Sequence, residues 1–233
     1  MKKDSLIRGT LILAAAALVA RALGLFQRVP MEYVLSNKGD TYYGVANNIY
    51  LLLLVVATAG IPSAISKMVS ERYALGRADE ARQVYRAALL FAAVAGVVIT
   101  LLLLAIAPFI ADNMMDRPGA AASIRAIAPA LLLFPIIAMM RGYFQGRQLM
   151  GAGGTSQIVE QIVRVVAAIG IAFTLYGWGR SDESIAAGAS FGSVFGSIAA
   201  FAVMLYYGRK LAAADRASGA GTRRIGAPRK LRL

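Results

Sequence analysis

The sequence predicts an all-α membrane protein, a bundle of helices that cross a bilayer several times. Of its 233 residues, 58% are apolar and 16% are charged, whereas soluble domains average about 45–50% apolar and about 25% charged residues. Uncharged runs of 25 residues occupy 42–66, 87–111 and 184–208. A helix of about 20 apolar residues is enough to cross the hydrocarbon core of a bilayer. The composition therefore argues against an ordinary soluble domain.

Six membrane-spanning helices are predicted, and with their short loops they form one lobe over residues 1–208. The approximate ranges of the helices are 6–28, 44–66, 85–111, 119–140, 157–178 and 185–208. The first range follows a short basic start, as a signal peptide does. Its apolar run is longer than that of a signal peptide, and further spans follow, so we expect it to remain as the first helix.

The distribution of basic residues predicts the orientation of the bundle. With the N-terminus placed inside, 18 of the 25 lysines and arginines lie on inside segments and only four lie on outside loops. Cytoplasmic loops carry the excess of Lys and Arg in membrane proteins. We therefore expect a multi-pass protein of the cytoplasmic membrane with both termini in the cytoplasm. This asymmetry accounts for much of the net charge of +13, so no nucleic-acid partner is needed to explain it.

The end of the chain differs from the rest in composition. Residues 209–233 are rich in Arg, Lys, Gly and Ala and lack apolar periodicity, which is typical of a disordered tail. A basic tail on the cytoplasmic side can bind anionic lipids, at about 1 kcal/mol per basic residue near the surface; alternatively, its charges only orient the last helix. The longest inside loop, 67–86, fits a solvated loop or a short amphipathic helix at the interface.

Glycine and proline mark features inside the spans. Gly188, Gly192 and Gly196 recur every four residues and predict a small-residue ridge on which another helix can pack closely. Prolines at 62, 108, 129 and 135 predict kinks or helix ends. The glycine-rich stretch 151–156 lacks the Gly-Lys-Ser/Thr ending of a phosphate-binding loop, so a flexible turn is expected there.

Residues for covalent chemistry are scarce. The chain has no cysteine and no histidine, which removes thiolate nucleophiles, the commonest general base and the commonest metal ligand. No Ser/His/Asp set, paired-carboxylate site or metal cluster is evident. We therefore expect a protein that is not an enzyme and that uses neither a cofactor nor a metal.

Charged residues within the predicted spans are the candidate functional groups. The candidates among them are Arg21, Arg125, Glu160 and Arg164. A charge at bilayer depth costs several kcal/mol and faces protein or water. Glu160 and Arg164 are four residues apart and could pair with each other, and the other arginines could extend to lipid headgroups. Alternatively, the arginines line a water-filled cavity for an anionic substrate such as a diphosphate, because a guanidinium matches phosphate oxygens with two parallel hydrogen bonds.

Four stretches, taken in order, resemble a known family. They are RALG at 21–24, AGIPSAISK at 59–67, RGYFQG at 141–146 and SQIVEQIVRV at 156–165. They are similar to the polysaccharide-biosynthesis flippases of the multidrug/oligosaccharidyl-lipid/polysaccharide exporter superfamily, in the branch of stage V sporulation protein B and the lipid II flippase. The resemblance implies one lobe of a fold like that of the multidrug and toxin extrusion (MATE) transporters, and a polyprenyl-diphosphate-linked saccharide as substrate.

The resemblance also implies roles for individual residues. Arg21 matches a cavity arginine of the first helix, and Asp40 matches an aspartate that follows it. A second arginine of that helix falls at Gln27, with Arg28 one residue later, and an arginine expected in the second helix is replaced by leucines near 52–54. We expect Arg21, Arg28, Arg125 and Arg164 to bind the substrate, and Asp40 and Glu160 to act in gating or ion coupling.

The predicted function is that of half a flippase, because members of this family carry about twice as many helices. It would move its lipid by alternating access, driven by an ion gradient or the membrane potential, together with a second lobe or a second copy of the chain. The alternative is a truncated, non-transporting membrane protein that acts as a scaffold in an envelope-biosynthesis complex. A membrane transferase is disfavoured, since its acidic metal ligands are missing.

Overall fold

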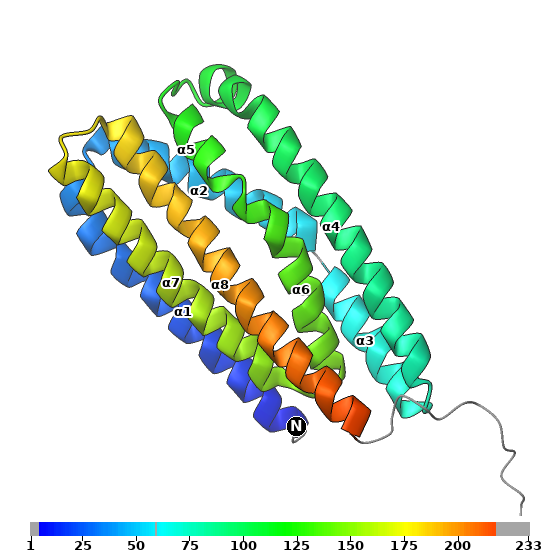
Figure 1. Cartoon of the computed structure of the whole chain (residues 1–233). Helices are drawn as coiled ribbons and strands as arrows, with labels where there is room; N and C mark the ends of the chain where they lie inside the picture. The colour runs from blue at the N-terminus through cyan, green and yellow to red at the C-terminus, as the bar shows by residue number, and fades with distance from the viewer. Residues whose placement is uncertain (1–4, 59, 218–233) are drawn as a thin grey trace, which may run out of the picture.

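The computed structural model describes residues 5–58 and 60–217, and this part of the chain is helical with no strand (Figure 1). The helical elements, in chain order, are α1 Leu6–Val34, α2 Asn37–Thr58, α3 Ile61–Ala74, α4 Ala78–Phe109, a π-helical turn Ile110–Met114, α5 Ala120–Ile127, α6 Ala130–Gly146, α7 Met150–Gly177 and α8 Asp182–Ala217. The predicted all-α membrane bundle is confirmed.

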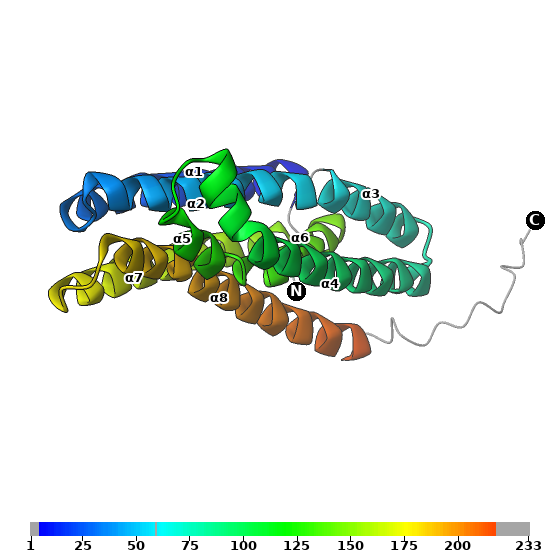
Figure 2. The same cartoon turned by 90° about the horizontal axis from the view of Figure 1, so that it is seen from above.

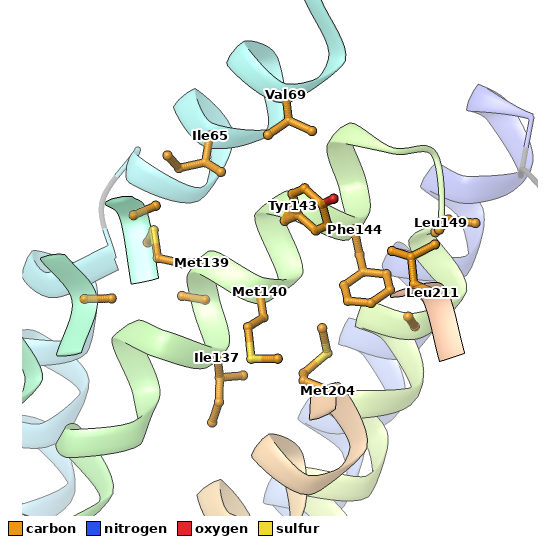
Figure 3. Close-up of a cluster of buried hydrophobic side chains, with 14 of the residues drawn as sticks. Ile65, Val69, Ile137, Met139, Met140, Tyr143, Phe144, Leu149, Met204 and Leu211 are labelled. Atoms are coloured by element: carbon orange, nitrogen blue, oxygen red, sulfur yellow. The ribbon is translucent and has the colours of Figure 1, made fainter. Parts of the chain in front are cut away.

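The helices form an elongated bundle in which α7 packs between α1 and α8 (Figure 1). In the view of Figure 2, α1, α2 and α3 run along one side of the bundle, and α7 and α8 run along the other. α6 contacts α3, α4 and α8. Figure 3 shows Met140 and Phe144 of α6 directed toward Met204 and Leu211 of α8, within the buried core at this end of the bundle.

Within the described residues, five helical stretches are long and apolar enough to cross a membrane, one fewer than predicted. The predicted span 44–66 is divided between α2 and α3. Gly60 adopts a left-handed conformation with φ of 73°, and Pro62 lies in the first turn of α3. Glycine accepts this φ without steric cost, and proline is tolerated in a first turn because its missing N–H would be unbonded there anyway.

The predicted span 119–140 lies within one helical stretch of membrane length, Ala120–Gly146, which has a local break between α5 and α6. α5 ends at Ile127, and Pro129 is the N-cap of α6, whereas Pro135 lies inside α6 without ending it. The predicted loop 67–86 is largely helical, because α3 continues to Ala74 and α4 already begins at Ala78. A short turn that contains Gly76, at φ of 73°, joins the two helices.

The turn predicted for the glycine-rich stretch 151–156 is wrong. This stretch lies in the first turns of α7. Its glycines allow close packing against α1. A Cβ added to Gly154 would lie 3.2 Å from Cγ2 of Ile12 and 3.4 Å from Cβ of Ala16. Tertiary packing therefore outweighs the low helix propensity of glycine here.

The predicted small-residue ridge of the last span lies against α7. A Cβ on Gly192 would lie 2.6 Å from the backbone nitrogen of Ala168, and a Cβ on Gly196 would lie 2.8 Å from Cβ of Arg164. The absence of side chains at these glycines lets the two helices approach closely.

The beginning of the predicted disordered tail is ordered. α8 continues to Ala217, so residues 209–217 are helical. This segment is held against the bundle because Leu211 is buried and Asp215 pairs with Arg147. Residues 218–233 lie outside the described residues, and their predicted contact with anionic lipids stays a prediction.

Candidate functional site

A polar pocket of about 410 Å³ opens between α1, α2 and α7. Its lining residues come from the second half of α1, the first half of α2 and, through Arg164, the middle of α7. The residues that line it are Gly24, Gln27, Arg28, Met31, Glu32, Asp40, Tyr43, Gly44, Asn47, Asn48 and Arg164.

Hydrogen bonds fix the inner wall of this pocket. The Gln27 side chain, only 5% exposed, donates from Nε2 to the Tyr43 hydroxyl over 2.9 Å and so joins α1 to α2. Arg164 donates from Nη2 to Oε1 of Gln161 over 2.6 Å, one turn earlier on α7. Gly196 of α8 packs behind Arg164, so the position of this guanidinium depends on the close approach of α7 and α8.

The pocket carries two positive and two negative side chains. Arg28 and Glu32 come from α1, Asp40 from α2 and Arg164 from α7. Within the described part of the chain, no ion pair joins either arginine to a carboxylate. The guanidinium groups are thus available for an anionic ligand and the carboxylates for a cation or a proton.

The structure brings together three of the six residues predicted from the sequence. Arg28, Asp40 and Arg164 line the pocket, whereas Arg21 and Arg125 are exposed outside it. Sequence reasoning missed Glu32, because it ended the first helix at residue 28 and so placed Glu32 in a loop. The helix continues to Val34, which puts Glu32 one turn from Arg28 on the same face.

Glu160, the sixth predicted residue, is held in a buried ion pair away from the pocket. Its carboxylate does not pair with Arg164. Instead, Oε2 of Glu160 accepts a hydrogen bond from Nη2 of Arg141 on α6 at 2.7 Å. The same guanidinium donates to Oγ of Ser156 over 2.9 Å, and Ser156 donates to the Ala200 carbonyl of α8 over 3.4 Å. This network ties α6, α7 and α8 together.

Charged and polar side chains thus surround a pocket in a bundle of bilayer-length helices, and this arrangement defines a multi-pass membrane protein. The described residues contain no group of three or more acidic side chains that could hold a metal ion.

The chain belongs to the polysaccharide biosynthesis protein family, whose model matches residues 6–224. It is 31% identical over 216 residues to the lipid II flippase MurJ of Bacillus subtilis (strain 168), and the matched region covers 89% of this chain and 40% of that protein. It is 35% identical over 201 residues to stage V sporulation protein B of the same organism, and the matched region covers 85% of this chain and 38% of that protein. The predicted family is confirmed.

Solved structures show the same fold. The chain superposes on a crystal structure of a MATE protein in its straight conformation with a TM-score of 0.71 and 18% identity, over 88% of this chain and 46% of that one. A crystal structure of a MATE mutant gives a TM-score of 0.69. The chain spans about two fifths of the length of its curated relatives. The activity stated in the name of the first relative is that of a flippase, which is transport rather than covalent catalysis.

Proposed function

We propose that this chain forms one lobe of a flippase for polyprenyl-diphosphate-linked saccharides, lipids of the lipid II type, in the cytoplasmic membrane. The observation that carries the proposal is the pocket between α1, α2 and α7, in which Arg28 and Arg164 lie unpaired with any carboxylate of the described residues. A diphosphate offers oxygens on both of its phosphorus atoms, so guanidinium groups from two helices can bind it at once.

The other polar residues of the pocket suit the saccharide. The side-chain amides of Asn47 and Asn48 both donate and accept hydrogen bonds, and they line the pocket on the α2 side. Sugar hydroxyls need partners of this kind. The polyprenyl chain remains in the lipid, against exposed apolar residues of α1 such as Leu25 and Phe26.

The carboxylates of the pocket give the lobe a means of ion coupling. With Glu32 and Asp40 ionised, the formal charge of the four ionisable groups is zero, and the attraction for a diphosphate is weak. When a cation or proton neutralises the carboxylates, the arginines hold the anion more strongly. Binding of the lipid and binding of the cation therefore favour each other. Glu160 contributes indirectly, because it positions α7 through Arg141.

Transport by alternating access requires a second lobe that moves against this one. Both termini of the lobe lie in the cytoplasm in this proposal, and the pocket lies toward the outer face.

The primary test is binding of a fluorescent polyprenyl diphosphate to the purified chain in detergent micelles. A charge-assisted hydrogen bond contributes about 1.5–3 kcal/mol, so Arg28→Gln and Arg164→Gln should each weaken binding by about 10- to 150-fold. Arg180→Gln is the matched control, because Arg180 is an exposed arginine at the same end of the bundle and outside the pocket. Unchanged binding by both pocket variants would refute the proposal. The roles predicted for Arg21 and Arg125 can be tested in the same assay.

A second experiment separates flippase from scaffold. The chain is reconstituted into vesicles at increasing density, and movement of the labelled lipid between leaflets is followed with a membrane-impermeant quencher. If two copies form the transporter, the flipping rate should rise with the square of protein density. Binding without flipping at every density would favour a separate second lobe or a scaffold role.

A further inference from the structure

A second cavity lies at the opposite end of the bundle from the candidate substrate pocket. It has a volume of about 360 Å³ and is bounded by α4, the end of α6 and the last turns of α8. Four arginines from three different parts of the fold line it, namely Arg82, Arg86, Arg147 and Arg216, against one carboxylate, that of Asp215.

Two of these arginines are held in place by carboxylates. Arg147 binds Asp215 through two hydrogen bonds of 2.7 Å each, and its guanidinium lies over the ring of Tyr73 at 4.7 Å. Burial lowers the pKa of Arg147, but the hydrogen bonds that it donates to Asp215, together with the electrostatic influence of Tyr143, Tyr73 and Asp215, raise that pKa above its ordinary value. Arg82 lies 3.7 Å from Asp215 and 3.5 Å from Asp79. This network makes a rigid, charged wall.

The other two arginines have no such partner. Arg86 and Arg216 are exposed, and no carboxylate of the described residues pairs with either. The cavity therefore has an excess of positive charge, and the two arginines without a carboxylate partner line it from α4 and α8. A phosphate group fits this arrangement, since arginine binds phosphate oxygens with paired hydrogen bonds.

The floor of the cavity is apolar and aromatic. Tyr85 and Tyr143 stack with their ring centroids 4.1 Å apart, and Phe144 and Leu211 complete the floor. Beyond Arg86, the exposed face of α4 becomes apolar within one turn, at Leu90, which is 69% exposed. Basic and apolar surfaces thus adjoin at the level where the apolar part of α4 begins, which is the level of lipid headgroups.

We propose that this cavity binds the headgroup of an anionic phospholipid. Arg86 and Arg216 bind the phosphate, Arg82 and Arg147 shape the wall, and the acyl chains lie along the exposed apolar face of α4. Basic pockets between membrane helices are known to hold anionic headgroups in this way. The proposal does not depend on the substrate pocket, which lies at the other end of the bundle.

The test is a comparison of two double variants of the full chain in neutral detergent. Arg86→Gln/Arg216→Gln removes both unpaired charges of the cavity. Arg209→Gln/Lys210→Gln removes two exposed charges of α8 that do not line it. Binding of phosphatidylglycerol and of phosphatidylcholine with the same acyl chains is measured by native mass spectrometry. We expect the parent chain to prefer phosphatidylglycerol, the cavity variant to lose at least tenfold in affinity for it, and the control to change less than twofold.

Equal losses in the two double variants would overturn the proposal, since they would show attraction by general surface charge. Equal binding of phosphatidylcholine by the parent chain would overturn it as well. Soluble glycerol phosphate is the third arm. If it displaces phosphatidylglycerol at similar concentrations, the ligand is a free phosphate compound and the lipid assignment is wrong. Polyprenyl diphosphate binding should be retained in the cavity variant, which separates this site from the proposed transport function.

Discussion

The ion pair of Arg141 and Glu160 gives a sharp test of how the lobe is held together. Arg141→Met removes the guanidinium that joins α6 to α7, and Glu160→Met removes its partner. The double variant Arg141→Met/Glu160→Met replaces the pair with two apolar side chains. These three variants and the parent chain complete a double-mutant cycle.

The magnitudes follow from the geometry. Nη2 of Arg141 lies 2.7 Å from Oε2 of Glu160, and the Glu160 side chain is 7% exposed, against 22% for Arg141. Removing Arg141 leaves a buried carboxylate without its cation and should cost about 3–5 kcal/mol of unfolding free energy. Removing Glu160 should cost less, about 2–3 kcal/mol, because water can still reach the guanidinium. The double variant should lie within about 1–2 kcal/mol of the parent, since apolar replacement of a buried pair is often neutral.

Unfolding of the purified chain in mixed detergent and sodium dodecyl sulfate micelles, followed by circular dichroism, measures these free energies. Arg209→Met is the control, because Arg209 is exposed on α8, and its substitution should change the unfolding free energy by about 0.5 kcal/mol or less. We expect a coupling energy of at least about 2 kcal/mol between Arg141 and Glu160. If the two single effects simply add in the double variant, the pair does not stabilise the lobe in the way described.

Gly192→Ala should lower the unfolding free energy by about 1–3 kcal/mol, because the added Cβ would lie 2.6 Å from the backbone of α7. Gly170 has open space around it, so Gly170→Ala should leave the unfolding free energy unchanged or raise it by up to about 1 kcal/mol. The same detergent titration measures both, and equal effects would contradict the close packing of α7 and α8. For topology, the cysteine-free chain allows single-cysteine variants: Arg180→Cys should react with an impermeant maleimide on intact cells, and Arg77→Cys only after permeabilisation. Labelling of Arg77→Cys on intact cells would reverse the predicted orientation.

The helices and their membrane character could be predicted because these signals are local. A run of uncharged residues predicts a span wherever it lies in the fold, and the four-residue spacing of Gly188, Gly192 and Gly196 predicts a packing face. The breaks were harder to place. Gly60 and Pro62 divide one predicted span, whereas Gly153 and Gly154 lie within a continuous helix, because α1 packs against them.

The site was only partly predictable, for a different reason. Each residue along a helix turns the side chain by about 100°, so a small error in a helix end changes which residues share a face. Ending the first helix at residue 28 hid Glu32, and the four-residue spacing of Glu160 and Arg164 suggested a pair that the fold does not form.

By itself, the sequence determined the membrane class, the approximate spans and the family of this protein, since hydropathy and short motifs are properties of neighbouring residues. Only the tertiary structure decided which charges meet. Arg28, Asp40 and Arg164 come from three helices, and Glu160 is bound by Arg141 from a fourth. Whether these side chains meet depends on the rotation and register of the packed helices. The glycine contacts between α7 and its neighbours set that rotation and register, and no single segment of the sequence encodes them.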